Sequence, residues 1–165
     1  LSSVFNVVWI FLWQYDYITL SVVMILALLA TLITIYMRLD IGKTKVPLTE
    51  KLCVHLPFSV YLGWITIASI ADFAATLVSV RWDGFGLSAQ TWAIVAMAIA
   101  LIATLAVIFA RRDIAYSLVI VWALVGIAVK QSNDQNIVLT AEIAIGVIFV
   151  ALALSFLIGK FKHRS

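Results

Sequence analysis

One acidic residue, Asp72, lies deep inside an apolar stretch that is long enough to cross a membrane. The stretch from Pro57 to Thr76 reads PFSVYLGWITIASIADFAAT, and about 20 mostly apolar residues in a helix span the hydrocarbon core of a bilayer. A carboxylate inside a spanning helix is costly and usually faces the bundle interior or a water-filled cavity. Asp72 therefore marks a candidate functional site. The alternative is that Asp72 hydrogen-bonds a neighbouring helix and only holds the bundle together.

Several distinctive residues share one face of the same helix. They recur every three or four positions, which places them in one stripe on a helix of about 3.6 residues per turn: Pro57, Tyr61, Trp64, Ala68 and Asp72. A pocket lined by indole and phenol rings with a few polar groups is the usual form of a site for a flat apolar ligand. The competing interpretation is that these rings pack in the core of the bundle.

The composition indicates a polytopic membrane protein. Of the 165 residues, 65% are hydrophobic and 12% are charged, whereas a soluble domain is about 45–50% apolar and about 25% charged. Orientation in the membrane explains the net charge of +3 better than nucleic-acid binding does, so no nucleic-acid partner is expected. The single cysteine, Cys53, excludes an intrachain disulfide framework and a multi-cysteine metal site, and we predict no metal site.

The hydropathy pattern predicts an all-α fold, a transmembrane helix bundle that forms a single domain over residues 1–165. Five complete spans are expected, at residues 18–37, 56–80, 90–110, 114–130 and 137–159. Residues 1–13 read as the end of a preceding helix, so we expect further helices upstream of Leu1. Ser88 is the expected N-terminal cap of the third span.

The basic residues divide unequally between the two sides of this topology. Nine of the eleven Lys and Arg residues fall on one side, in loop 38–54, at Arg111 and Arg112, and in the C-terminal tail. The other two, Arg81 and Lys130, fall on the opposite side. Because cytoplasmic loops carry an excess of Lys and Arg, we predict that loop 38–54, the double arginine and the C-terminus are cytoplasmic.

Several other membrane functions lack the residues that they need. No lysine lies in the middle of a span, so a retinal Schiff base has no attachment site. The two histidines, His55 and His163, lie at a membrane edge and in the tail, which excludes a haem held by two buried histidines of this chain. No nucleotide-binding P-loop is present. No nucleophile, metal cluster or oxyanion device stands out, so nothing indicates an enzyme and no catalytic residue is assigned.

Two motifs resemble the translocator protein, or tryptophan-rich sensory protein, family (TspO/MBR). The third helix of that family carries Asn-x-x-Trp followed by large aromatics, and the segment NVVWIFLW from Asn6 to Trp13 is similar. The family's last helix carries Tyr-x-x-Trp-x-x-x-Ala-x-x-x-Asn, a spacing that is matched by Tyr61, Trp64, Ala68 and Asp72. Asp replaces the family's Asn in this match. The resemblance covers about residues 5–80, and the three spans after it have no counterpart in the family's five-helix bundle.

The resemblance implies an integral membrane protein that binds a tetrapyrrole (haem or a porphyrin) or a sterol-like lipid and acts in sensing, transport or as a receptor. The residues that it places in the ligand site are Trp9, Trp13, Tyr61, Trp64 and Asp72. Their implied roles are stacking by the rings and a hydrogen bond or ligation by Asp72. The expected partners are the lipid bilayer, the ligand, and either a second copy of the chain or other subunits of a membrane complex.

Two further functions fit the same sequence. Small residues such as Ala96 and Ala100 permit close helix packing, which suits a structural or pigment-holding subunit of a larger membrane complex. Asp72 and Glu142 are acidic residues near membrane depth and suit a small proton-coupled transporter. The alternative for Glu142 is that its side chain faces interfacial water.

Overall fold

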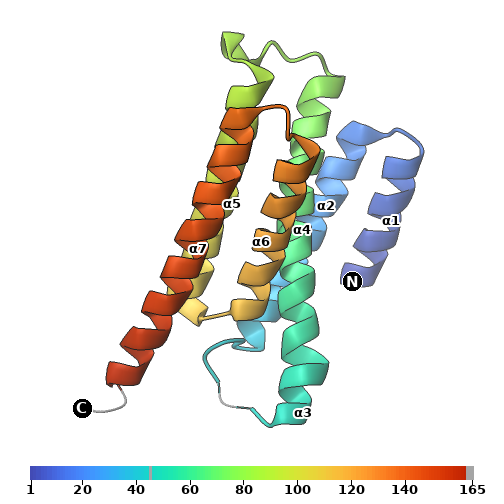
Figure 1. Cartoon of the computed structure of the whole chain (residues 1–165). Helices are drawn as coiled ribbons and strands as arrows, with labels where there is room; N and C mark the ends of the chain where they lie inside the picture. Colours follow the sequence, from blue (N-terminus) through green and yellow to red (C-terminus); the bar gives the residue numbers. More distant parts are fainter. Residues whose placement is uncertain (45, 163–165) are drawn as a thin grey trace. The chain divides into compact units, whose positions relative to one another are not determined.

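The computed structural model describes the backbone of residues 1–44 and 46–162 and the side chains up to residue 158, apart from residue 45. Within these ranges the chain is helical and contains no strand, as predicted. The apolar helices follow the predicted spans closely (Figure 1): α1 Ser2–Gln14, α2 Ile18–Arg38, α4 Leu56–Ser79, α5 Ala89–Arg111, α6 Ile114–Lys130 and α7 Gln135–Lys162. The end of the C-terminal tail, which belongs to the orientation prediction, lies outside the described residues.

Among the described residues, four stretches are long and apolar enough to cross a membrane. They are α2, the continuous helical run Leu48–Ser79, α5 and residues Gln135–Ile158 of α7. α6 has 17 residues, which is near the lower limit of about 17 for a spanning helix. α1 contributes 13 residues from Ser2 onward. α1 and α6 are thus the shorter apolar helices of the described residues.

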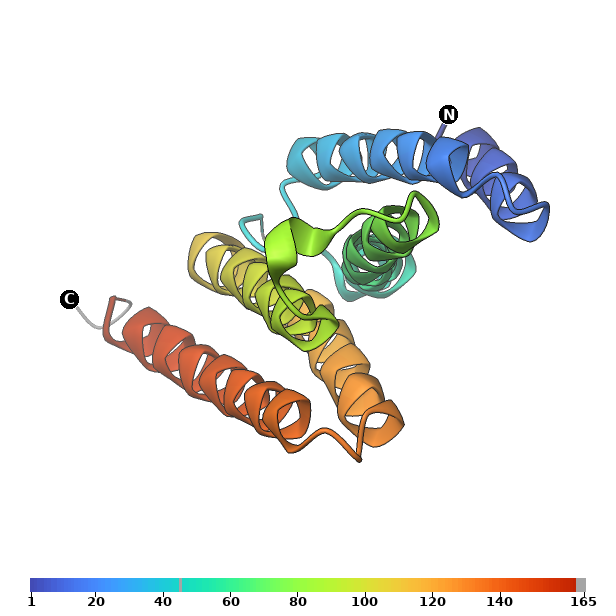
Figure 2. The same ribbon diagram turned by 90° about the horizontal axis from the view of Figure 1, so that it is seen from above.

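The helices group into two compact units, which are described separately. Unit 1 comprises residues 1–41 and 46–86, and unit 2 comprises residues 42–45 and 87–165. In unit 1, α2 packs against both α1 and α4; in unit 2, α7 packs against both α5 and α6 (Figure 2). The single domain over residues 1–165 stays a prediction.

The predicted loop 38–54 is too long, because its second half is helical. A short helix, α3 Leu48–Glu50, begins after Pro47 and continues through the π-helical turn η1 Lys51–His55 into α4. The π turn ends two residues before Pro57, which has no N–H to donate to the preceding turn. Single π turns of this kind occur inside α-helices as local changes of the hydrogen-bond pattern. The polar residues of this turn were interpreted as a loop because they mark the membrane edge rather than the end of the helix.

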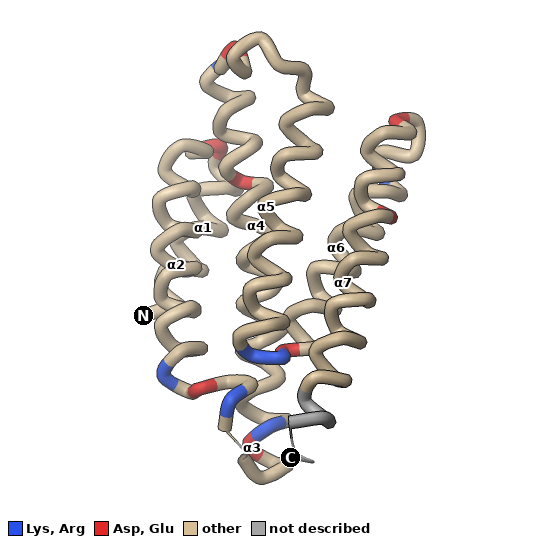
Figure 3. The backbone as a smooth tube through the Cα atoms, turned by 90° about the vertical axis from the view of Figure 1, so that its left-hand side faces the viewer, with Lys and Arg blue, Asp and Glu red and all other residues tan. Residues whose placement is uncertain are grey.

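The helices of unit 1 stop in a common way. The residue after each C-cap has a positive φ: 60° at Asp16, 45° at Asp40 and 53° at Arg81. The N–H of the next residue then donates to a carbonyl five positions back, in the pairs Tyr17–Leu12, Ile41–Tyr36 and Trp82–Leu77. This is the Schellman motif, which usually has glycine at the positive-φ position. Here a charged residue occupies it, so charges gather at the helix ends and most of each helix is free of them (Figure 3).

Side-chain hydrogen bonds cap the N-terminal ends of α5 and α6. Ser88 caps α5 as predicted, since its hydroxyl accepts from the backbone N–H of Thr91 at 3.2 Å. Asp113 caps α6 by accepting from the N–H of Tyr116 at 3.1 Å. Gly42, with φ +83°, lies so close to the end of α5 that an added Cβ would clash with the carbonyl oxygen of Arg111. This close approach attaches the segment beginning at Gly42 to unit 2.

Each unit has an aliphatic core. In unit 1 the most completely buried large side chains are Ile25, Leu28, Leu32 and Ile65. In unit 2 they are Ile108, Ile120, Leu124 and Ile148, with the small residues Ala100, Ala141, Ala144 and Ala151 buried beside them. Without a hydrophobic driving force between helices in lipid, such close contacts and small side chains provide the packing energy. The core of unit 1 fixes the positions of α1, α2 and α4, which carry the candidate site.

Candidate functional site

The carboxylate of Asp72, on α4, is hydrogen-bonded to side chains of α1 and α2, the other two apolar helices of unit 1. The indole Nε1–H of Trp9, on α1, donates to its Oδ2 at 2.9 Å. The hydroxyl of Ser21, on α2, lies 2.8 Å from Oδ1 and 3.1 Å from Oδ2. Asp72 is 2% exposed and Ser21 is fully buried. The prediction that Asp72 faces the bundle interior is therefore confirmed for unit 1.

The order of the helices explains why these side chains meet. The positive-φ turn at Asp16 reverses the chain between α1 and α2, so Trp9 and Ser21 lie on facing helices near the same end. α4 runs back along α2 (Figure 1), and its last turns lie beside the start of α2. The hydroxyl of Thr76 marks this alignment, because it donates to the carbonyl of Ile18 at 3.3 Å. Asp72, one turn before Thr76, then lies opposite Ser21.

A groove of about 310 Å³ lies between α1 and α4, and we call it the tryptophan groove. Its lining residues are Trp9, Trp13, Trp64, Ile67, Ala68, Ala71 and Asp72. Small-molecule sites usually measure about 300–1,000 Å³ and are mostly apolar with a few polar groups. The tryptophan groove has this composition and lies at the lower end of the size range.

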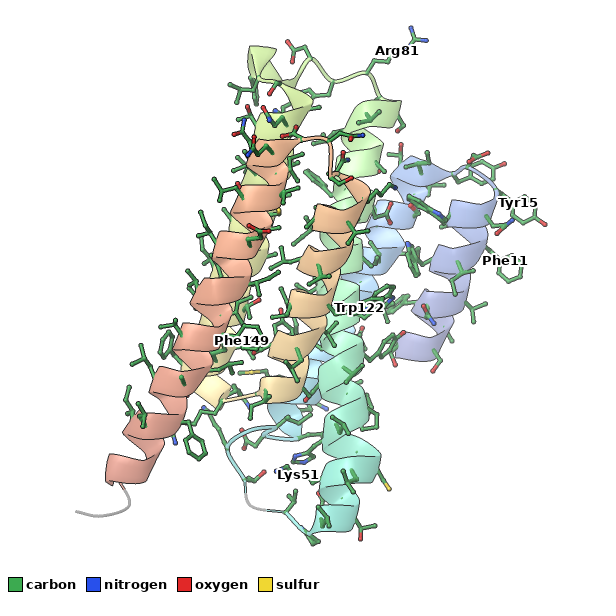
Figure 4. All side chains as sticks on the ribbon, in the orientation of Figure 1. Phe11, Tyr15, Lys51, Arg81, Trp122 and Phe149 are labelled. Carbon is green, nitrogen blue, oxygen red and sulfur yellow. The ribbon has the colours of Figure 1, made fainter. Side chains whose placement is uncertain are left out.

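The groove is open rather than sealed. Trp13 and Trp64 each keep 44% of their surface exposed, and Ala71 is also exposed. The small side chains of Ala68 and Ala71 leave space beside the indole rings. Phe11 and Tyr15 stack on each other with ring centroids 6.5 Å apart and point away from α2 and α4 (Figure 4). α1 thus directs Trp9 and Trp13 to the groove and other aromatic rings to its outer side.

Four of the five residues predicted for the ligand site line this one groove. They are Trp9, Trp13, Trp64 and Asp72. Tyr61 does not line it: this residue is half-buried on α4, one turn before Trp64. The stripe predicted on α4 therefore divides, and only its second half reaches the groove. Ligand binding by these residues stays a prediction.

The sequence reasoning missed Ser21, which contacts Asp72 directly. One signal could have found it. Ser21 is a hydroxyl near the start of α2, at the same membrane depth as a carboxylate near the end of the antiparallel α4. Glu142, the second acidic residue considered at membrane depth, lies on α7 in unit 2, and its side chain is exposed.

The groove offers aromatic faces for stacking rather than polar atoms that could coordinate a bound molecule. Its indole rings supply large flat faces, and such rings bind other flat apolar groups by offset or edge contacts. Asp72 is the charged residue among the lining residues, and its two oxygens already accept from Trp9 and Ser21. The arrangement is therefore suited to holding a flat apolar molecule by its faces.

Comparison with known proteins gives one match. The family model of TSPO-like proteins matches residues 1–154. The match confirms the family resemblance and extends it beyond residues 5–80, because it also takes in the spans that had no counterpart in the motif comparison. No curated protein and no solved structure matches the chain.

Proposed function

The chain belongs to the family of TSPO-like proteins, and we propose that it binds a flat apolar ligand, a tetrapyrrole or a sterol-like lipid, in the tryptophan groove. The observation that supports this proposal most directly is the convergence of three indole rings, those of Trp9, Trp13 and Trp64, on one groove. Such rings bring large apolar area with little loss of side-chain freedom. A binding site inside a membrane-spanning helix bundle supports a role in sensing or transport of the ligand.

The open side of the groove supports entry of the ligand from the membrane. The exposed surfaces of Trp13, Trp64 and Ala71 lie on helices whose outer faces are apolar. A volume of about 310 Å³ accommodates part of a large macrocycle or sterol, and the remainder of the ligand extends along the open side. The ligand then exchanges contacts with lipid for contacts with indole rings, and shape selects it more than hydrophobicity does.

The distribution of basic residues supports an assignment of the groove's polar end to one half of the membrane. The excess of basic residues in loop 38–54, at Arg111 and Arg112 and in the C-terminal tail supports a cytoplasmic location for those segments. Asp72 is close to the other end of α4. The polar end of the groove therefore lies in the membrane half that faces away from the cytoplasm.

The test is a titration of the purified protein with protoporphyrin, followed by quenching of tryptophan fluorescence and by the Soret band. Ala71→Leu fills the groove at an exposed position and is expected to weaken binding at least about tenfold, the equivalent of about 1.4 kcal/mol. Ala74→Leu is the matched control, because Ala74 is also exposed on α4 and does not belong to the lining of the groove.

Saturable binding that is weakened by Ala71→Leu and unchanged by Ala74→Leu supports the proposal. Equal affinity of the two variants would place the site elsewhere on the chain. A sterol analogue is titrated in parallel. If protoporphyrin gives no change in the signal but the sterol analogue binds, the ligand belongs to the sterol-like class. Failure of both probes to bind would overturn the proposed function.

A further inference from the structure

We propose that Asp72 is a positioning residue, whose carboxylate holds the indole ring of Trp9 in place at the tryptophan groove without contacting the ligand. This inference rests on the proposed function and assigns Asp72 a role different from the hydrogen bond or ligation to the ligand that the family resemblance implies. It also explains how a carboxylate can stand at a position where the family has an amide.

The surroundings of Asp72 leave it little access to a ligand. The residue is 2% exposed. Its Oδ2 accepts the indole N–H of Trp9 at 2.9 Å, and its Oδ1 lies 2.8 Å from the Ser21 hydroxyl. Each oxygen therefore already has a donor from a neighbouring helix, and the buried carboxylate presents almost no surface to a ligand atom. The carboxylate therefore acts on its neighbours.

The two donors depend on Asp72 to different degrees. The Ser21 hydroxyl also lies 2.7 Å from the carbonyl oxygen of Ile18 on its own helix, so it keeps an acceptor when the carboxylate is removed. Among the described residues, Asp72 is the acceptor that the structure gives to the indole of Trp9. Loss of Asp72 therefore affects Trp9 far more than Ser21.

The ring of Trp9 also needs this bond because packing alone does not fix it. Trp9 is only half-buried, and α1 contains no fully buried residue. The indole can rotate out of the groove at little packing cost once its N–H is released. The bond to Asp72 ties the ring to α4, which carries the remaining lining residues, and so keeps the two walls of the groove in register.

A double-mutant cycle tests whether Asp72 acts through Trp9. Protoporphyrin affinity is measured for the wild type, Trp9→Ala, Asp72→Ala and the double variant. We expect each single variant to bind about tenfold more weakly, and the double variant to bind no more weakly than Trp9→Ala, because residues that act as a unit are not additive. A further weakening of the double variant, equal to that of Asp72→Ala alone, would show direct contact between Asp72 and the ligand and would overturn the proposal.

Two conservative variants separate positioning from a general loss of structure. Asp72→Asn retains a side-chain oxygen that accepts from Trp9 and is expected to bind within about twofold of the wild type. Ser21→Ala leaves the Trp9–Asp72 bond in place and is expected to do the same. Loss of binding in Asp72→Asn, with the fold intact by circular dichroism, contradicts the proposal.

A measurement without ligand keeps this inference distinct from the proposed function. The indole N–H resonance of Trp9 is assigned in a ¹H–¹⁵N spectrum by its disappearance in Trp9→Phe. We expect it to move in Asp72→Ala and to stay in place in Ser21→Ala. An unmoved resonance in Asp72→Ala overturns the positioning role. A moved resonance together with absent probe binding retains the positioning role and rejects the ligand class instead.

Discussion

A buried carboxylate in unit 1 and two buried hydroxyls in unit 2 find their hydrogen-bond partners in different ways. In unit 1, the carboxylate of Asp72 accepts hydrogen bonds from the side chains of two other helices, at Trp9 and Ser21. In unit 2, the fully buried hydroxyls of Thr104 and Ser117 donate to backbone carbonyls of their own helical turns, at 2.7 Å and 2.8 Å. The Asp72 cluster links three helices, whereas these two hydroxyls, like that of Ser69 in unit 1, are satisfied within one helix.

This difference in hydrogen bonding affects how closely the helices pack within each unit. A hydroxyl that is satisfied by its own helix leaves the helix surface smooth, so that small residues such as Ala100 and Ala141 can be buried against the neighbouring helices of unit 2. A carboxylate bonded to an indole ring needs the bulk of that ring between α1 and α4. Large rigid rings beside small alanines do not fill the space, and the tryptophan groove remains. Interhelical polar contacts and an open groove therefore occur together in unit 1.

The largest effect on stability is expected at the close approach in unit 2. Gly42→Ala is predicted to destabilise the protein by about 2–4 kcal/mol, because it combines a strained positive φ of +83° with a clash against the Arg111 carbonyl. Gly86→Ala in unit 1 is the matched control: its φ is +75°, but the space around it is open. The measurement is thermal unfolding in detergent, followed by circular dichroism. Equal losses in the two variants would show that backbone strain alone accounts for the effect.

The second prediction compares the effect on stability of an Ala→Leu substitution at one position in each unit. Ala141→Leu places three extra carbon atoms at a fully buried position of α7 and is expected to cost about 1–3 kcal/mol by overpacking. Ala71→Leu points into the groove of unit 1, where its residue is exposed, and is expected to change the unfolding temperature little. If Ala71→Leu destabilised the protein as much as Ala141→Leu, the groove would be closed in solution and the contrast between the units would fail.

The smallest effect on stability is expected from removing one buried polar group in each unit. This comparison tests whether a hydrogen bond between helices matters more than one within a helix. Asp72→Ala leaves the indole N–H of Trp9 without its acceptor and is expected to cost about 1–2 kcal/mol of stability. Thr104→Val removes a hydroxyl that bonds only within its helix turn, retains the shape of the side chain, and is expected to change stability by less than about 0.5 kcal/mol. Unfolding midpoints of the two variants are compared under identical detergent conditions. A larger loss for Thr104→Val would reverse the assignment of polar roles to the two units.

Much of the fold was predictable from residue type and spacing. The helix boundaries of α2, α5 and α6 lie within one residue of the predicted spans, because apolar runs and the polar turns between them are local signals. The cap at Ser88 was predictable for the same reason. The loop after α2 was overestimated, because a helix that continues past the membrane edge has the same polar composition as a loop.

The candidate site was predictable only in part. The spacing of Trp64, Ala68 and Asp72 places them on one face of α4, and the aromatic segment of α1 supplies Trp9 and Trp13. The same spacing wrongly suggested that Tyr61 shares their surroundings. Ser21 belongs to none of the sequence motifs, and its importance becomes visible only from its hydrogen bond to the carboxylate of Asp72.

The sequence by itself determined that this chain is a membrane-embedded helix bundle, where most of its helices begin and end, and that Asp72 faces inward. These properties follow from hydropathy and helical periodicity, which depend on residues close together in the chain. Only the tertiary structure decided that Trp9, Ser21 and Asp72 form one hydrogen-bonded cluster and that three indole rings line one groove. Those contacts depend on the relative depth and rotation of α1, α2 and α4, which are set by packing among residues far apart in the sequence.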